Sequence, residues 1–550
     1  MNKKLLSIGK GILPVLALLP GLGLVLYYVI GPAAGHMTSD CTDSLRWAQA
    51  SFLSGRLVSD NFNYAAILPF GGNLIFWPFI ALFGYGLKAQ IWGLAFFVLL
   101  FAAALYYFAR GLEMSRLAAA GLVSVTMLIL SSSGKLREIL WEHIFYYSLG
   151  ILFFCVGFGL VLRIIKKDRL RVVTPRDRRW YAVRLICLTV FSVLAATDGL
   201  QTLVCYTLPI LAGLLTERFL DGETPLLSKK NYGSWLVWLL VFFASLLGFL
   251  LIPLVCHGVQ SGYMNGYSAY TAMSKWTENF QKIFPNWAAL LGISVKDGDY
   301  FVTPASIGQA IRIFGALFLL FFPFVLLCRL PKLKNSGLKM LVVGHAALTA
   351  FVFFAVVFGR LGAANWRLTP VLGTGILTCY SAAALGLKEK KLSGRFGSLG
   401  LAFLILLALL PAAEIRKMPA DNDRDNAWFT AAAELKARDL KYGYATFWWC
   451  ELLTMVSENE AVVSNMDISK DGKPVKRTYQ DFLDCYEDKN TDRYFLLLME
   501  SENKSMAGWL SEQRAAGKIR EDFIIPTKKY SAGGYTGEKL YVYVFGENIF

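Results

Sequence analysis

Long apolar segments recur between residues 13 and 413, and they constrain most strongly what this chain can fold into. Each is about as long as the roughly 20 residues that an α-helix needs to cross a bilayer. Because 55% of the 550 residues are apolar and the long runs need lipid to cover them, an ordinary soluble enzyme is excluded. The pattern predicts a mainly α, polytopic transmembrane helical bundle of about eleven spans, at residues 13–31, 89–109, 117–133, 144–165, 182–198, 201–216, 235–256, 308–328, 340–358, 366–386 and 396–413.

The apolar segment 65–84 is an exception, because prolines and glycines interrupt it. Pro69, Gly71, Gly72 and Pro78 fall where a helix interior tolerates such residues poorly. We therefore predict that this segment is re-entrant or interfacial rather than a further crossing.

Basic residues gather in the short loops between apolar segments, where they set the orientation of a membrane protein. Between Arg163 and Arg184 lie seven Lys or Arg residues against two Asp residues. With Lys3 and Lys4 before an uncleaved first span, this loop predicts a multi-pass protein of the cell (plasma) membrane, with its N-terminus cytoplasmic and its C-terminal region outside. The net charge of +16 therefore belongs to membrane topology and does not indicate nucleic acid. Further basic loops are Lys229/Lys230, 329–339 and 388–395.

The composition changes after Ala413, where charged residues and short strand-like runs replace the long apolar segments. The alternation predicts a small extracytoplasmic α/β domain at residues 414–550, after a transmembrane domain at residues 1–413. No CxxC pair points to zinc, and the sequence leaves open whether Cys450 and Cys485 form a disulfide. The strand-like runs are 442–448, 461–465, 493–499 and 540–545, and the helix-like stretches are 426–439, 449–458 and 505–517.

The first polar loop, residues 36–60, carries the carboxylates Asp40 and Asp43 three residues apart, and helical spacing follows them. We predict an amphipathic helix on the membrane surface that holds its acidic residues at the opening of the helical bundle. The alternative is a connector whose charges merely face water. The apolar face would consist of Leu45, Ala48, Phe52 and Leu53, with Asp43, Arg46, Gln49 and Arg56 largely off it.

A second cluster of ionisable residues precedes the span at 144–165, where Arg137, Glu138, Glu142 and His143 follow one another closely. Charges at the end of a span are costly to desolvate, so they usually have a partner or a function. The alternative is an interfacial ion pair of the glutamates with Lys135 or Arg137. His143 is by itself more often a hydrogen-bonded end residue than a catalyst.

Two arginines lie at the beginning of the span at 366–386. Arg360 precedes it, and Arg367 follows Trp366 in its first turn. The planar fork of arginine can bind two oxygens of a phosphate. The alternative is a membrane anchor, because aromatic and basic residues are common at span ends. The outer loop 257–307 is rich in aromatic residues that could stack on sugar rings or form an interfacial belt, among them Tyr263, Tyr267, Tyr300 and Phe301.

The layout of about residues 10–390 resembles the glycosyltransferase C superfamily, in particular its protein O-mannosyltransferase and aminoarabinose-transferase type. In those proteins an outer loop starting Asp-Glu follows the first span, and a helix ending at glycine and a proline-rich segment come next. Here Asp40 takes the place of the Asp, Cys41 replaces the Glu, and Asp43 lies one helical turn later. Further matches are Ala48, Gly55, Pro69, Leu74, Phe76, Trp77 and the run Trp366-Arg367-Leu368-Thr369-Pro370.

The resemblance implies inverting transfer of a hexosyl or pentosyl group from a polyprenyl-phosphate sugar to a cell-envelope glycan, lipid or protein. No organic cofactor is implied, but the departing phosphate needs positive charge from arginine or a divalent metal. The alternative is a transporter or flippase for a lipid-linked glycan, without covalent chemistry. The implied roles are general base for Asp40, or secondly Asp43, phosphate binding for Arg360 and Arg367, and substrate binding for Arg137, Glu138, Glu142 and His143.

Overall fold

The computed structural model describes residues 3–65, 68–169, 174–221, 228, 231–256, 269–386, 392–531 and 534–550. Two compact units make up the chain. The helical unit comprises Met1–Tyr27, Phe97–Pro253 and Asn265–Met418. The sheet unit comprises Tyr28–Phe96, Leu254–Met264 and Pro419–Phe550, so it joins the first polar loop to the C-terminal region.

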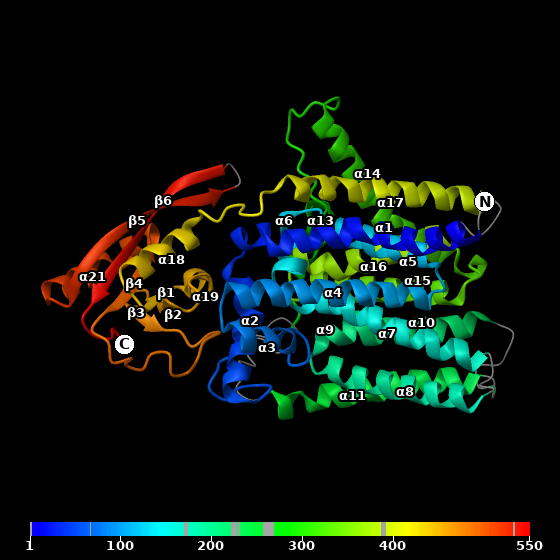
Figure 1. The fold of residues 1–550 in the computed structure, drawn as a ribbon, viewed down its shortest axis with the longest axis horizontal. Helices are drawn as coiled ribbons and strands as arrows, with labels where there is room; N and C mark the ends of the chain where they lie inside the picture. Colours follow the sequence, from blue (N-terminus) through cyan, green and yellow to red (C-terminus); the bar gives the residue numbers. More distant parts are fainter. Residues whose placement is uncertain are drawn as a thin grey trace. The chain divides into compact units, whose positions relative to one another are not determined.

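The helical unit consists of long apolar helices whose axes run roughly parallel (Figure 1). Among the described residues, ten helices are long and apolar enough to cross a membrane, or up to eleven if one pair bent by 119° is a single span. The predicted fold class and number of spans are therefore confirmed. The long helices are α1 (Lys3–Ile30), α4 (Leu87–Gly111), α5 (Arg116–Ile129), α7 (Tyr146–Arg169), α8 (Pro175–Ala196), α10 (Leu208–Asp221), α11 (Tyr232–Val255), α14 (Pro304–Cys328), α15 (Ser336–Phe358), α16 (Thr369–Gly386) and α17 (Leu392–Lys417).

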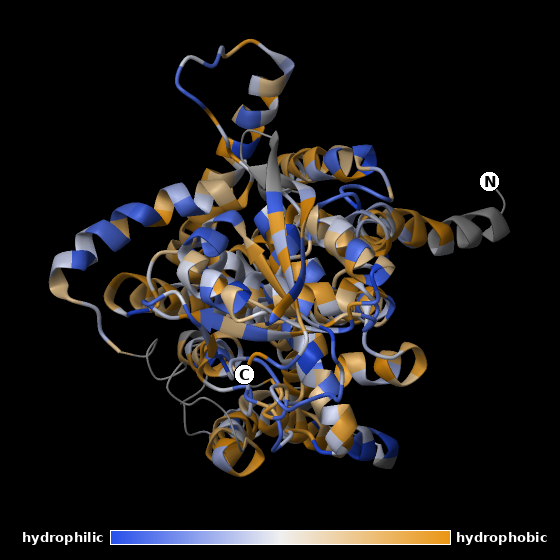
Figure 2. Cartoon of the chain, turned by 90° about the vertical axis from the view of Figure 1, so that its left-hand side faces the viewer, coloured by the Kyte–Doolittle hydropathy of each residue, from blue (hydrophilic) through white to orange (hydrophobic). Residues whose placement is uncertain are grey.

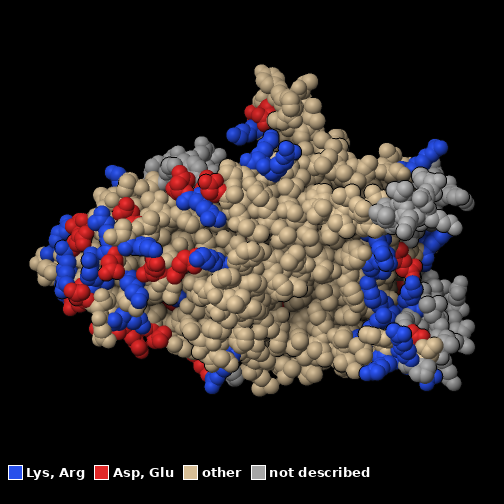
Figure 3. All heavy atoms as spheres, viewed as in Figure 1, with Lys and Arg blue, Asp and Glu red and all other residues tan. Residues whose placement is uncertain are grey.

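Large apolar side chains on the outside of the helical unit explain why it needs a bilayer. Phe243, Leu250 and Phe354 are 58%, 62% and 50% exposed, and hydrophobic residues, orange in Figure 2, are visible on many of the helices. In Figure 3 the sides of the helical unit carry few charges, whereas Lys and Arg gather at one end.

Close helix packing in this unit depends on a small residue at one crossing. The N–H of Gly21 in α1 donates to Ser124 Oγ in α5 at 2.8 Å. A Cβ atom on Gly21 would lie 2.4 Å from Ser124 Cα, so only glycine allows the two backbones to approach this closely.

The sheet unit is built around a six-stranded mixed sheet with the order β3-β2-β1-β4-β6-β5. β1 pairs in parallel with β2 and β4, and the other pairs are antiparallel. The strands are β1 (Tyr442–Ala445), β2 (Val462–Ile468), β3 (Pro474–Lys476), β4 (Tyr494–Met499), β5 (Ile519–Ser531) and β6 (Gly534–Phe545).

The apolar run of β4 is explained by burial on both of its faces. Phe495 and Leu497 belong to the core on the side of α18 (Ala427–Ala437) and α19 (Phe447–Val456). Leu496 and Leu498 belong to the opposite core, which also includes Met506 and Leu510 from the region of α20 (Glu500–Ser505) and α21 (Ala507–Ala515).

The sequence prediction found β1, β2, β4 and β6 but missed β3 and β5. β5 is an edge strand with many charged residues, which hide its alternation. All nine cysteines are among the described residues and none forms a disulfide, so Cys450 and Cys485 are not paired.

The apolar segment 65–84 contributes the short helix α3 (Gly72–Phe83) to the sheet unit. Its 12 residues span about 18 Å, which is too short to cross a hydrocarbon core of about 30 Å. Four residues named in the sequence analysis lie outside the described residues, namely Tyr263, Tyr267, Lys229 and Lys230.

Candidate active site

The helix α2 (Ser39–Ser54), which carries both candidate base residues, is fixed at its two ends by local structure. Thr38 is the N-cap residue, and its N–H donates to Cys41 Sγ at 3.4 Å. Gly55 ends the helix with φ of 66°, a left-handed conformation that favours glycine. Asp40 is half-buried in the first turn, where the helix dipole stabilises negative charge.

The polar side of α2 is buried inside the sheet unit. Asp43 and Arg46 are only 5% and 4% exposed, whereas Phe52 and Leu53 are 41% and 67% exposed. This corrects the alternative in which the charges of the helix merely face water. The physical reason is that the C-terminal region supplies partners for the charged side chains of α2.

Two consecutive residues of the C-terminal region, Gln480 and Asp481, provide those partners. Asp481 is fully buried and accepts from Arg46 Nη2 at 2.7 Å. Gln480 Oε1 accepts from the indole N–H of Trp47 at 2.5 Å. The backbone of Gln480 has φ of 60°, an unusual value for a residue other than glycine. Its N–H donates to the Asn63 carbonyl at 2.9 Å, and the N–H of Asn63 donates to the Asp481 carbonyl at 3.0 Å. The first polar loop and the C-terminal region thus form one hydrogen-bonded structure.

A cluster of three carboxyl groups lies where α2 packs on α19. Glu451 of α19 is 1% exposed, and its Oε2 lies 3.0 Å from Thr42 Oγ. Burial, followed by the charges of Glu451 and Asp40, raises the pKa of Asp43 well above its ordinary value, although a hydrogen bond from Gln480 opposes this. Burial also raises the pKa of Glu451 to about 8, with Arg46 acting in the opposite direction.

Among the described residues, no three His, Cys, Asp or Glu side chains are placed to hold a metal ion together.

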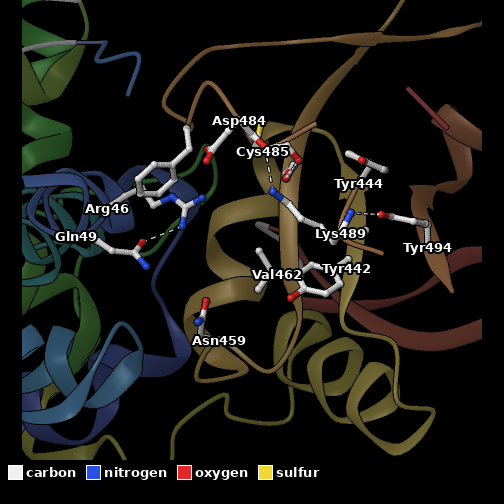
Figure 4. A pocket seen from close by; sticks show the side chains of 13 residues that line it. Arg46, Gln49, Tyr442, Tyr444, Asn459, Val462, Asp484, Cys485, Lys489 and Tyr494 are labelled. Carbon is white, nitrogen blue, oxygen red and sulfur yellow. Dashed lines mark hydrogen bonds between the residues drawn. The ribbon is translucent and has the colours of Figure 1, made fainter. Parts of the chain in front are cut away.

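A cavity of about 220 Å³ lies in the sheet unit beside α2 and the first residues of β1, β2 and β4 (Figure 4). Arg46 contributes to its wall, and its side chain donates to Gln49 Oε1 at 2.9 Å. The Lys489 ammonium group donates to the Asp484 carbonyl at 3.0 Å. The lining therefore combines aromatic rings with donors and acceptors, and it includes Tyr442, Tyr444, Tyr494, Phe482, Asn459 and Ser464.

In the helical unit, the short helix α6 (Gly134–Arg137) carries cations that are already paired. Lys135 Nζ lies 2.6 Å from Glu138, which is the interfacial ion pair that the sequence left as an alternative. Lys135 also lies 4.8 Å from the ring centre of Trp366. Arg137 donates to the Ser131 carbonyl at 2.9 Å and lies 3.7 Å from Glu414.

Glu138 to Glu142 form one turn of π-helix, a geometry that is frequent at functional sites. Glu142 and His143 at its end are 1% and 4% exposed. Burial, followed by the charge of Lys135, lowers the pKa of His143 to about 3. The imidazole is therefore neutral at pH 7 and carries no positive charge toward a phosphate.

The two arginines near α16 differ in their surroundings. Arg367, in the short helix Asn365–Leu368, is half-buried and donates to the Gly362 carbonyl at 3.2 Å. Arg360 is exposed, and its backbone N–H donates to the Ala269 carbonyl at 2.8 Å.

The structure separates the predicted site residues into two groups. Asp40 and Asp43 belong to the sheet unit. Lys135, near Arg137, contacts Trp366, near Arg367, so two segments of the helical unit that carry predicted residues lie side by side. The helical unit holds all the other predicted residues. These are Arg137, Glu138, Glu142, His143, Arg360 and Arg367.

The sequence analysis missed Glu451, Gln480 and Asp481. Glu451 is the only charged residue of the apolar helix α19, a signal that could have marked it as buried beside a partner. Gln480 and Asp481 lie outside helices and strands and carry no comparable signal.

These features define a polytopic membrane protein with a C-terminal mixed sheet. The solved structures that share the fold include ArnT from Cupriavidus metallidurans bound to undecaprenyl phosphate, with a TM-score of 0.51, 11% identity and coverage of 97% of both chains. ArnT in the apo state gives a TM-score of 0.51 and 12% identity over 98% of both chains. The predicted resemblance is thus confirmed at the level of the fold.

Weaker similarity extends to the apo oligosaccharyltransferase of Archaeoglobus fulgidus, with a TM-score of 0.46, 11% identity and coverage of 96% of this chain and 74% of that chain. No protein-family model and no curated protein sequence matches the chain.

Proposed function

We propose that the chain is an inverting membrane glycosyltransferase that moves a sugar from a polyprenyl-phosphate donor to a hydroxyl group of a cell-envelope acceptor. The observation that carries this proposal is Asp40, half-buried on a helix that residues of the C-terminal region hold in place, in a chain with the ArnT fold. The ArnT structure contains undecaprenyl phosphate, which supports a lipid-linked donor. The basic end of the helical unit supports a cytoplasmic N-terminus and an outer-face reaction.

In the proposed reaction, the Asp40 carboxylate accepts the proton of the acceptor hydroxyl. The acceptor oxygen forms a bond to the anomeric carbon from the side opposite the phosphate. The bond from that carbon to the phosphate oxygen breaks, and polyprenyl phosphate leaves with the electron pair, so the configuration inverts. A general base of this kind contributes about 10²- to 10⁴-fold to the rate.

Asp43 remains the second choice for the base, and two observations count against it. Its side chain is 5% exposed, which restricts the approach of an acceptor. Burial and the neighbouring carboxyl groups raise its pKa, so it keeps its proton to higher pH than an ordinary aspartate. Asp40 is less buried and can meet a substrate.

The cationic residues of the helical unit are proposed to bind the lipid phosphate. Arg367 and the exposed Arg360 present guanidinium groups that suit phosphate oxygens. Arg137 is a further candidate cation, on the segment whose Lys135 contacts Trp366 beside Arg367. Glu138, Glu142 and the neutral His143 offer polar atoms that can orient the sugar.

The cavity beside Arg46 is proposed to bind a sugar or another polyhydroxylated group of the acceptor. Its volume of about 220 Å³ equals roughly seven water molecules, which suits one ring rather than a long oligosaccharide. Tyrosine rings next to amide, hydroxyl and ammonium groups are the surroundings that a polar ring needs.

The test is incubation of the purified full-length chain with a panel of polyprenyl-phosphate sugars, with release of lipid phosphate followed by mass spectrometry. Wild type should release it, Asp40→Asn should be slower by about 10²- to 10⁴-fold, and Asp60→Asn, an exposed change in the same loop, should match wild type. Release by both wild type and Asp40→Asn would keep the transferase and discard Asp40 as its base. Release by neither would favour the transporter alternative.

A further inference from the structure

The hydrogen-bond partners of Thr42 indicate the protonation state of Glu451. Thr42 Oγ lies 2.7 Å from the Ser39 carbonyl oxygen and 3.0 Å from Glu451 Oε2. A hydroxyl has one proton to donate, and a carbonyl oxygen can only accept, so the shorter contact takes the proton of Thr42. The contact with Glu451 is then a good hydrogen bond only if Glu451 is a carboxylic acid that donates to Thr42.

The surroundings of Glu451 also favour the neutral acid. Its Oε1 is buried and has no hydrogen-bond partner among the described residues, a costly state for a carboxylate. The carboxyl groups of Asp43, Asp40 and Asp481 face it, and the positive charge nearby, on Arg46, is already paired with Asp481. The other titratable groups that face it, whose pKa values burial raises, are Tyr85, Cys450 and Tyr479.

We propose that Glu451 is a positioning residue whose proton completes a hydrogen-bonded chain from Glu451 to Thr42 to Ser39 and so holds the first turn of α2 in place. That turn carries Asp40, so Glu451 acts through Asp40 and not on the substrate. The role in catalysis rests on the proposed function, whereas the protonation of Glu451 does not. The C-terminal region thereby contributes a residue on which the reaction depends.

The proposal has a definite pH dependence. As pH rises through the pKa of Glu451, about 8, the acid loses its proton and can no longer donate to Thr42. The new negative charge also repels Asp43 and Asp40 across the cluster. The rate should therefore fall on the alkaline side, by about tenfold for one lost hydrogen bond.

The test compares Glu451→Gln with Glu451→Ala in the full-length chain. The amide of Gln can donate to Thr42 at any pH, so Glu451→Gln should keep activity within about twofold at pH 7 and lose the alkaline fall. Glu451→Ala should lose about tenfold at pH 7 because it cannot donate. Glu460→Gln, a change of an exposed glutamate in the same region, should leave the alkaline fall unchanged.

Infrared difference spectroscopy of the same samples tests the proton directly and needs no substrate. Wild type at pH 7 should show the carbonyl stretch of a protonated carboxylic acid that Glu451→Gln removes and Glu460→Gln retains. Absence of that band would overturn the proposal whether or not the chain is a transferase. The positioning role would be overturned if wild type shows the infrared band but the rate of Glu451→Gln still falls at alkaline pH as it does in wild type. Absence of transferase activity in wild type would refute the proposed function and leave the infrared result standing.

Discussion

The charged residues of the sheet unit and those of the helical unit are held in different ways. In the sheet unit, Arg46 and Asp481 are 435 positions apart in sequence, and both are almost completely buried. In the helical unit, Lys135 and Glu138 are three positions apart and remain partly exposed. A buried, long-range pair fixes one geometry, whereas a local, exposed pair can exchange its partner for a ligand.

This difference suits the two tasks in the proposed reaction. A general base must be placed accurately against one proton, so a rigid support around α2 is useful. Cations that bind a phosphate need open space and spare donors, and a cation in a local ion pair can be recruited at a small cost. We therefore expect mutations of the buried charges in the sheet unit to affect mainly the structure. Mutations of the exposed cations in the helical unit should affect mainly substrate binding.

Breaking the buried pair should have the largest effect on structure. We expect Arg46→Met and Asp481→Asn each to destabilise the sheet unit by about 3–5 kcal/mol. Arg46→Met leaves the buried Asp481 charge without its partner, and Asp481→Asn does the same to the buried Arg46 charge. The double variant Arg46→Met/Asp481→Asn should lose less stability than the sum of the losses in the two single variants. Hydrogen exchange of α2 and β2 in the full-length protein measures this. The matched change in the exposed pair Arg514–Asp522 should cost about 1 kcal/mol or less.

Equal exchange rates in the buried and exposed variants would contradict the comparison, because burial would then make no difference to the pair. An Arg46→Met variant that is stable but inactive would instead place Arg46 in the reaction.

The effect of removing a cation from the helical unit should be intermediate. Arg367→Gln removes a charge that is proposed to stabilise the departing phosphate, so kcat/KM for the donor should fall by about 10²-fold with the fold intact. Arg367→Lys should recover part of the loss. Arg360→Gln, at the more exposed position, should cost less than Arg367→Gln. An equal loss of kcat/KM in Arg360→Gln and Arg367→Gln would show that the exposure of an arginine does not decide how much it contributes to the reaction.

The comparison also explains which parts of the molecule could be predicted from the sequence. The spans follow from apolar length, and the end of α2 at Gly55 and the strand β4 follow from local residue types. These signals are carried by neighbouring residues, and the surrounding fold does not override them.

The support of the candidate site could not be predicted in this way. Arg46 was placed on a polar face, but its partner Asp481 lies in an irregular segment with no periodic pattern. The sequence left open whether the charges of α2 merely face water, because the neighbours of a helix in three dimensions do not appear in its own sequence. The local ion pair of Lys135 and Glu138, by contrast, was foreseen as an alternative because its members are three positions apart.

The smallest effect should come from the cavity beside α2, and it sharpens the comparison because the site lies within the rigid unit. Lys489 is half-buried there, and its ammonium group donates to a backbone carbonyl that a solvent molecule can also satisfy. Lys489→Ala should therefore raise KM for the acceptor about tenfold and leave kcat and the donor KM unchanged, since it removes binding that is equal in the ground and transition states. Lys470→Ala, at an exposed position outside the cavity, should change neither constant. A change in kcat alone would place Lys489 among the residues that support α2, and an unchanged acceptor KM would remove the cavity from acceptor recognition.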